Sequence, residues 1–231
     1  GTWIYCYGLT SFPILDVSSG TDFSYAWGDC TSLTSFPILD VSSGIDFSYT
    51  WENCYSLTSF PILDVSSGIY FISAWYDCSG LTSFPLLDVS SGIYFISAWE
   101  NCSALTSFPL LDVSSGTNFN RAWANCSDLT SFPLLNFSSG INFNYAWYGC
   151  TKLSSFPANI FNSCTSTNFN GAFINCALTA LSIQNITASL VFAGRSGGIL
   201  SMTGGTNATP NAAGLAHIAT LRSRGWTVTH R

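Results

Sequence analysis

Hydrophobic and polar positions along this chain follow one pattern that returns every 24 residues. Each repeat holds a leucine, a phenylalanine three residues later, a short apolar stretch, a polar turn, and a second apolar segment with one tryptophan and one cysteine. The nine residues at 12–20 recur letter for letter at 36–44 and at 60–68. A fixed period of about 20 to 50 residues is typical of proteins in which each repeat stacks on the one before it. The pattern therefore predicts one continuous column of stacked coils.

Two elements are predicted for each repeat from the spacing of its apolar residues. In the second repeat the alternation of Phe36 and Ile38 predicts a strand, which Pro37 keeps short because proline has no N–H to donate. The stretch Asp40–Gly44 indicates a turn, since Asp and Ser bond their own backbone and Gly permits positive φ. The stripe from Phe47 to Leu57 has spacings of 3, 1, 3 and 3, which predict a short helix.

These elements predict an α/β solenoid with parallel strands along one face and short helices along the other, as in a right-handed leucine-rich-repeat coil. We expect about seven coils over residues 1–177. The register slips at the end, where Cys176 comes 26 residues after Cys150 and Phe173 takes the place of the tryptophan. The chain begins at Gly1, in the middle of a repeat, so we expect either a mature or cut product of something longer or a missing upstream piece.

Residues 178–231 lose the period, and we expect them to form a C-terminal α/β cap over the apolar end of the column. The pattern there predicts a helix capped by Ser182, a strand over 199–203, a turn at Gly204-Gly205, a second helix that opens at Thr209-Pro210 and stops at Gly225, and a last strand over 226–229.

The segment from Ala98 to Pro109, AWENCSALTSFP, resembles the A-F-x-x-C-x-x-L-x-x-I pattern of BspA-like leucine-rich repeats. Such repeats occur in bacterial and protist surface proteins, and similar arrays occur in phage tail fibres. Tryptophan replaces the usual phenylalanine and the predicted strand carries proline, so this chain departs from the pattern at two positions. The resemblance covers about three quarters of the chain and implies surface adhesion or recognition without naming a ligand. The last segment, GLAHIATLRSRGWTVTH, is similar to the closing segments of repeat arrays in phage and bacterial surface proteins.

Tryptophan and cysteine each keep one position in successive repeats, which predicts a core ladder. Side chains in such a ladder point in parallel about 4.8 Å apart, whereas a disulfide needs Cβ atoms about 3.8 Å apart. We therefore expect buried free thiols that pack as small hydrophobic groups. Pairing of the off-register Cys164 with Cys150 or Cys176 is an alternative, and metal binding is another, although no C-x-x-C motif occurs. The core ladder comprises Trp27, Trp51, Trp75, Trp99, Trp123, Trp147, Cys30, Cys54, Cys78, Cys102, Cys126 and Cys150.

Aspartates form a second ladder, in which stacked like charges must be compensated. One interpretation is a turn in which each carboxylate accepts backbone N–H bonds from the residues that follow it. The alternative is calcium that bridges neighbouring coils, since carboxylate oxygens suit this ion. Asn136 replaces the aspartate in the sixth repeat and favours the turn, because Asn caps such a turn equally well. This turn ladder comprises Asp16, Asp40, Asp64, Asp88 and Asp112.

Positions at which the repeats disagree are the candidates for recognition, because stacking already explains the positions that do not change. The third and fourth repeats place Tyr70, Ile72, Tyr94 and Ile96 where flanking repeats carry Asp, Asn or Ser. Exposed apolar side chains side by side indicate a contact surface for a partner or for another copy. The alternative is simple surface drift after duplication.

A threonine row, from Thr10 to Thr130, runs beside a serine row from Ser11 to Ser131. A flat, regular set of hydroxyl groups could bind ice or sugars. The alternative is that small hydroxyl residues suit an exposed short strand.

Composition and motifs limit the function further. Charged residues make up 8% and hydrophobic residues 47% of the chain, which does not fit a disordered protein. No apolar run is long enough to insert into a membrane. A net charge of −6 with only six Lys and Arg excludes a nucleic-acid groove. The motifs G-x-S-x-G, H-E-x-x-H and G-x-x-x-x-G-K-[ST] do not occur, so we predict no enzyme activity, no metal and no cofactor.

We therefore expect a non-catalytic repeat protein, extracellular, at the cell surface or on a virion, that serves in adhesion or receptor recognition. Its expected partner is a host-surface protein or a glycan. The alternative is a structural subunit that binds other copies of itself, as a homo-oligomer, fibre or filament.

Overall fold

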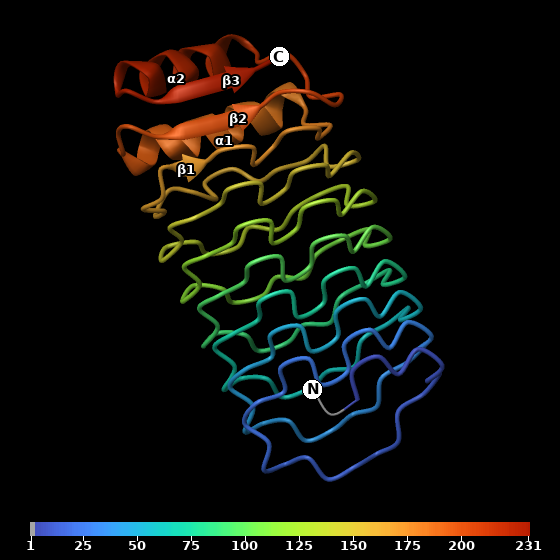
Figure 1. Ribbon diagram of the computed structural model, residues 1–231. Coiled ribbons are helices and arrows are strands. Elements are labelled where there is room, and N and C mark those ends of the chain that lie inside the picture. The colour runs from blue at the N-terminus through green and yellow to red at the C-terminus, as the bar shows by residue number, and fades with distance from the viewer. Residues whose placement is uncertain (1–2) are drawn as a thin grey trace.

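The computed structural model describes residues 3–231, so the start of the first repeat at Gly1 lies outside the described residues. Equivalent segments of successive repeats lie over one another in one column, with the C-terminal helices at its far end (Figure 1). Single-residue parallel bridges join positions 24 residues apart, from Asp22 with Asp46 through to Asn118 with Asn142. The period of the sequence is therefore the step from one coil to the next.

The named helices and strands of the described chain all lie near its C-terminus. β1 (Asn168–Phe169), β2 (Ile199–Met202) and β3 (Thr227–His230) form a parallel sheet in the order β1-β2-β3. α1 (Ala180–Ala193) packs against α2 (Ala212–Ser223). A bridge from Asn142 to Asn168 joins this small sheet to the column, so the sheet continues the ladder of the coils.

Both helices predicted for the C-terminal segment exist, but each begins at a different residue from the predicted one. Thr179 caps α1 and accepts the amide of Ser182, which lies inside the first turn. Asn211 caps α2, so Pro210 precedes the helix and does not open it. Gly225, with φ at 81°, follows the end of α2 as predicted. The two predicted strands agree with β2 and β3 to within one residue at each end.

The short helix predicted in each repeat is wrong. In the second repeat the amides of Phe47, Tyr49 and Trp51 donate to carbonyl oxygens of the next coil, at 2.8, 2.8 and 2.9 Å. The amides of Thr50 and Glu52, between them, close turns on carbonyl oxygens of their own coil. This alternation gives each coil a parallel backbone ladder, and we call the side formed by residues 22–29 and their equivalents the ladder face.

Left-handed residues explain why this segment is not helical. Tyr49 and Asn53 have φ at 59° and 57°, and the equivalent residues of the other repeats also have positive φ. Two left-handed residues four positions apart in each repeat reverse the chain before a helical turn is complete. Apolar residues then recur at intervals of three and four without any helix.

The strand predicted around Phe36 and Ile38 is also wrong. Phe36 and Leu39 are buried, whereas Ile38 is 71% exposed, so the side chains do not alternate between core and solvent. On this side of the described coils the only bridges join Ser11 with Ser35 and Ser131 with Ser155. Proline in each repeat has no N–H and interrupts the ladder. The laddered side of each coil is thus the side for which a helix was predicted.

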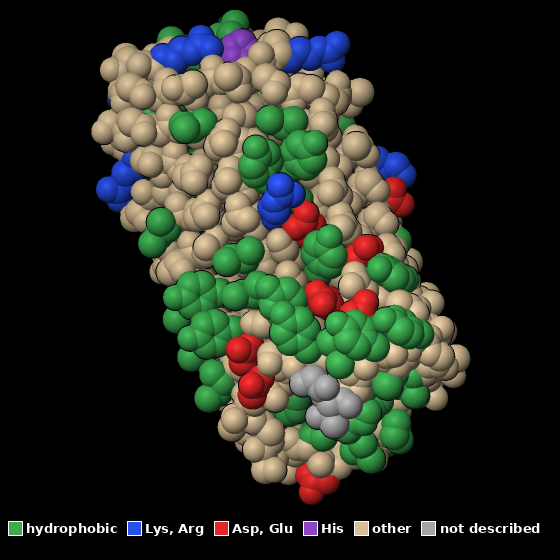
Figure 2. Space-filling view, in the orientation of Figure 1, with side chains coloured by type: hydrophobic (Ala, Val, Ile, Leu, Met, Phe, Trp, Pro, Cys, Tyr) green, Lys and Arg blue, Asp and Glu red, His purple; other side chains and the backbone are tan. Residues whose placement is uncertain are grey.

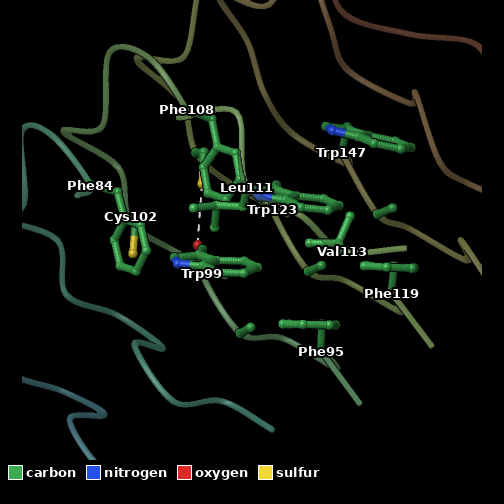
Figure 3. Close-up of a cluster of buried hydrophobic side chains, with 14 of the residues drawn as sticks. Phe84, Phe95, Trp99, Cys102, Phe108, Leu111, Val113, Phe119, Trp123 and Trp147 are labelled. Atoms are coloured by element: carbon green, nitrogen blue, oxygen red, sulfur yellow. Dashed lines mark hydrogen bonds between the residues drawn. The ribbon is translucent and has the colours of Figure 1, made fainter. Parts of the chain in front are cut away.

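Buried aromatic rings stack along the column and form its core (Figure 3). Trp99 and Trp123 stack with ring centroids 5.6 Å apart and planes at 6°. Phe108 meets Trp99 edge-on, with centroids 4.9 Å apart and planes at 77°. This edge-to-face geometry is favourable for aromatic pairs. The six tryptophans of the predicted core ladder are all fully buried: Trp27, Trp51, Trp75, Trp99, Trp123 and Trp147.

Candidate functional site

Tyr70 and Tyr94 form the centre of the contact surface expected from the differences between repeats. Their backbones are bridged, and their rings stack with centroids 5.3 Å apart and planes at 4°. The two residues are 38% and 36% exposed. Ile72 and Ile96 lie two residues further along the same ladder and are half-buried. The structure therefore brings the four predicted residues together as one strip across two coils.

Local hydrogen bonding shows how this strip differs from the coils beside it. In the coil before it, Oδ1 of Asp46 accepts the amide of Ser48 at 2.8 Å. In the coil after it, Oδ1 of Asn118 accepts the amide of Asn120 at 3.1 Å. A tyrosine side chain is too long for this short bond, and its ring lies against the next ring instead. The surface thus changes from polar to aromatic while the backbone ladder continues unchanged.

A second tyrosine pair and an unpaired carboxylate extend this surface. Tyr25 and Tyr49 stack with centroids 4.5 Å apart and planes at 7°. Burial of the half-buried Glu52, and then the charge of Asp29, raise the pKa of the Glu52 carboxyl to about 7. In the described chain the Glu52 carboxylate has no basic partner. Hydrophobic and acidic side chains gather over the lower half of the molecule in the space-filling view (Figure 2).

Acidic and basic residues occupy different parts of the chain. The twelve acidic residues all lie at or before Asp128, and the six Lys and Arg all lie at or after Arg121. Within residues 3–231 they meet in two ion pairs, Arg121 with Glu100 at 3.3 Å and Lys152 with Asp128 at 2.8 Å. Arg121 also lies over the ring of Tyr145, 5.0 Å from its centroid. Basic side chains gather at the end of the molecule that carries the helices (Figure 2).

The cysteines of the core ladder each donate their thiol to a tryptophan carbonyl of the preceding coil. Sγ of Cys102 lies 3.2 Å from the carbonyl oxygen of Trp75. Burial raises the pKa of these thiols, to about 11 at Cys30 and to about 12 at Cys150. They are therefore protonated donors at neutral pH. The same contact is made by Cys30, Cys54, Cys78, Cys126, Cys150 and Cys176.

All nine cysteines are free. The alternative pairing of Cys164 does not occur, because its thiol lies against the carbonyl oxygen of Gly140 at 3.6 Å. Burial raises the pKa of Cys164 to about 11. The cysteines therefore stabilise the stack as packed, protonated thiols.

The turn interpretation of the aspartate ladder is confirmed. Oδ1 of Asp40 accepts the amide of Ser42 at 3.2 Å and its hydroxyl at 2.7 Å. These two bonds lower the pKa of the exposed Asp40 carboxyl. Asn136 accepts the amide of Ser138 in the same way. The described residues contain no group of three or more His, Cys, Asp or Glu placed to hold a metal ion. The amide bond recurs at Asp16, Asp64, Asp88 and Asp112.

A row of exposed aliphatic side chains runs along the other side of the coils and was missed by the sequence analysis. It follows the proline of each repeat, and its members are 53% to 80% exposed. The available signal was the pair of consecutive aliphatic residues after each proline, because only one of two neighbours can face the core. We call this set the aliphatic row: Ile14, Ile38, Ile62, Leu86, Leu110 and Leu134.

The hydroxyl rows lie beside the aliphatic row, and both are exposed. Four hydroxyls of the threonine row, those of Thr34, Thr82, Thr106 and Thr130, donate to the backbone carbonyl oxygen of the threonine in the preceding coil, at 3.1 to 3.4 Å. Their donors are therefore used within the column. This bonding favours the structural interpretation of the threonine row over a lattice that binds ice or sugars.

No protein-family model matches this chain, and no curated protein is significantly similar to it. None of the helices in residues 3–231 is long and apolar enough to cross a membrane.

Proposed function

We propose that the chain is a leucine-rich-repeat-type solenoid without catalytic activity that uses its ladder face for adhesion or receptor recognition, outside the cell or on a virion. The observation that carries this proposal is the strip of stacked, exposed tyrosines at Tyr70 and Tyr94. Tyrosine is enriched at interfaces because it offers a large, rigid contact area with one polar end. Repeat proteins commonly bind through such extended surfaces.

The chemistry of the strip fits a host-surface glycan or protein. The flat rings of Tyr25, Tyr49, Tyr70 and Tyr94 offer π-faces to sugar C–H groups or to apolar side chains. Carboxylates such as Asp46 and Glu52 offer acceptors to hydroxyl or cationic groups. The ladder face before Arg121 carries no basic residue, so a strongly acidic partner is disfavoured there.

A glycan array together with binding to host-surface preparations tests this proposal. The double variant Tyr70→Ala/Tyr94→Ala should bind at least about tenfold more weakly, because removal of a central aromatic contact commonly costs more than about 1 kcal/mol. Tyr55→Ala is the matched control, since Tyr55 is similarly exposed but lies outside the tyrosine strip. Undiminished binding by the double variant would show that the strip is not the recognition surface.

Self-assembly is the second candidate function, and the aliphatic row is the observation that favours it. Contiguous exposed apolar side chains mark sites of protein association. Sedimentation combined with negative-stain imaging separates the two functions. Fibres at micromolar concentration would support a structural subunit, whereas a discrete species would support a recognition protein.

A further inference from the structure

The aliphatic row is an exposed apolar feature that lies apart from the tyrosine strip. Its six side chains occupy one position in six successive coils. Each exposes on the order of 100 Å², so the row offers roughly 600 Å² of contiguous aliphatic surface. That area is at the upper end of what a soluble monomer leaves in water.

Two polar rows flank the aliphatic row. On one side lies the serine row from Ser11 to Ser131, whose side chains are exposed and can donate from their hydroxyls. On the other side lies the turn ladder, in which each aspartate uses Oδ1 for its own turn. The second carboxylate oxygen remains available as an acceptor. One face therefore presents donors, aliphatic groups and acceptors in three parallel rows with the same step.

We propose that this face binds the same face of a second copy, in a parallel pair related by a two-fold axis that runs along the column. The axis lies between the proline and the aliphatic residue of each repeat. In the second repeat this places Ile38 against Pro37 of the other copy. It also places the carboxylate of Asp40 opposite the hydroxyl of Ser35 of the other copy. Within one repeat these two residues lie on opposite sides of the axis, equally many residues away from it.

The charges decide the relative direction of the two copies. An antiparallel pair would place one turn ladder against the other. The aspartates of this ladder are ionised at neutral pH, because hydrogen bonds from the serines two residues later lower the pKa of Asp16, Asp40 and Asp88. Like charges a few ångströms apart repel by about 1 kcal/mol in water. The first 120 residues contain no Lys or Arg that could compensate. The parallel pair instead gives each carboxylate a hydroxyl donor.

The repeat itself indicates a second copy as the partner. Six equally spaced contacts can form together only with a surface that has the same step, and another copy of this chain has it. Roughly 1,200 Å² buried over both copies reaches the area of specific interfaces. The pair is closed, since it covers the row and leaves nothing for a third copy. This inference concerns a closed pair and not the fibre of the structural-subunit alternative, and it does not depend on ligand binding by the ladder face.

Sedimentation equilibrium of the whole chain tests the pair. We expect a dimer at micromolar concentration, and at least a tenfold weaker association for Ile62→Ser/Leu86→Ser. Ile141→Ser is the matched control, because Ile141 is 61% exposed, close to the 67% of Ile62, but directly precedes the ladder face and is not part of the aliphatic row. A wild-type monomer at about 100 µM, or a double variant that associates as well as the wild type, would overturn the proposal.

Disulfide trapping tests the direction, in a Cys6→Ser background because Cys6 is the one cysteine that is not fully buried. Ile38→Cys alone and Leu110→Cys alone should each give covalent dimers, since each residue lies next to the axis of a parallel pair and only one position across it from its own equivalent. Covalent dimers only from a mixture of the two variants would show an antiparallel pair and overturn the proposal. Ligand binding by the ladder face can be measured on the disulfide-linked dimer and on a monomeric variant. Binding by either would support the adhesion proposal whatever the outcome for the pair, so each proposal can be contradicted without the other.

Discussion

At the scale of single residues, the tryptophan ladder buries N–H groups without hydrogen-bond partners, which lowers the stability of the fold. Six buried indole nitrogens have no hydrogen-bond partner in the part of the chain that the structure describes: Trp27, Trp51, Trp75, Trp99, Trp123 and Trp147. An unpaired buried donor costs about 1–3 kcal/mol. Phe173 already replaces the indole in the last coil and stacks on Trp147 with centroids 5.1 Å apart. Ring area, and not the N–H group, is therefore what the position requires.

Trp99→Phe should change the free energy of unfolding by less than about 1 kcal/mol, because loss of the unpaired donor offsets a cavity that costs about 1 kcal/mol. Trp99→Ala should destabilise by about 3–5 kcal/mol. Urea unfolding measures both. Trp226→Phe is the control, since its Nε1 donates to the carbonyl oxygen of Arg195 at 3.0 Å and its loss should be destabilising. A loss of about 3 kcal/mol or more in Trp99→Phe would contradict this account.

The thiols give a second prediction at this scale. Burial raises the pKa of Cys30 to about 11 and of Cys150 to about 12, so these thiols resist alkylation at pH 8. Cys6 is half-buried and should react first in the native protein. All nine cysteines should react after denaturation. Mass spectrometry counts the labels, and rapid native labelling of Cys102 or Cys126 would contradict the buried ladder.

Sequence reasoning at this scale succeeded where a side chain bonds its near neighbours. The turn at Asp40 follows from residues two positions apart. The bond from Cys102 to Trp75 spans 27 residues, and its acceptor depends on how far one coil is offset from the next. That offset is not encoded in any local pattern.

At the scale of elements, one pattern was compatible with two backbones. Apolar spacings of three and four are produced by a helix and also by a chain that turns at left-handed residues. The signal for the second was present, because Asp29, Asn53, Asn101, Asn125 and Gly149 occupy one position in the repeats and all tolerate positive φ. The companion position holds Tyr, Ser or Arg, which gives no such signal. The tail helices were predicted because capping and stop residues surround a longer apolar period.

Ser73→Gly should stabilise the protein by about 0.5–1 kcal/mol, because Ser73 has φ at 51° and glycine adopts this conformation without strain. Ser59→Gly should destabilise it by a similar amount, about 0.5–1 kcal/mol, since Ser59 is not among the positive-φ residues and glycine there only adds chain entropy. Urea unfolding of the two variants measures the difference. Equal signs for the two substitutions would show that the left-handed backbone is not strained.

At the scale of the whole molecule, the period and the tail were predictable, but the sides of the coil were interchanged. Strand and helix were assigned from side-chain patterns, whereas the ladder forms where no proline interrupts it. The position of the tyrosine strip was still predicted, because the differences between repeats mark the strip whichever backbone the segment adopts. The aliphatic row was not predicted, since its exposure depends on whether the coil buries Ile38 or Leu39, and the structure buries Leu39.

The separation of charge gives the last prediction. Glu52 lies in the acidic part of the molecule without a basic partner, and burial raises its pKa from 4.5 to about 7. The folded state therefore holds this proton more tightly than the unfolded state does. The stabilisation that comes from this tighter proton binding is complete below pH 4.5 and is lost as the pH rises through 7. Glu52→Gln should remove this loss and stabilise the protein at pH 8 by about 1 kcal/mol, a value reduced for partial solvent screening.

Chemical unfolding at pH 4 and at pH 8 measures the effect. The variant and the wild type should have nearly equal stability at pH 4 and should differ at pH 8. Glu100→Gln is the matched control, because Glu100 occupies the same position two coils later but pairs with Arg121 at 3.3 Å. Loss of that ion pair should destabilise the control at pH 8, so the two substitutions should have opposite signs there. A destabilised Glu52→Gln at pH 8 would mean that the Glu52 carboxylate has a cationic partner, whereas opposite signs would identify it as an unpaired acid on a face that lacks basic residues.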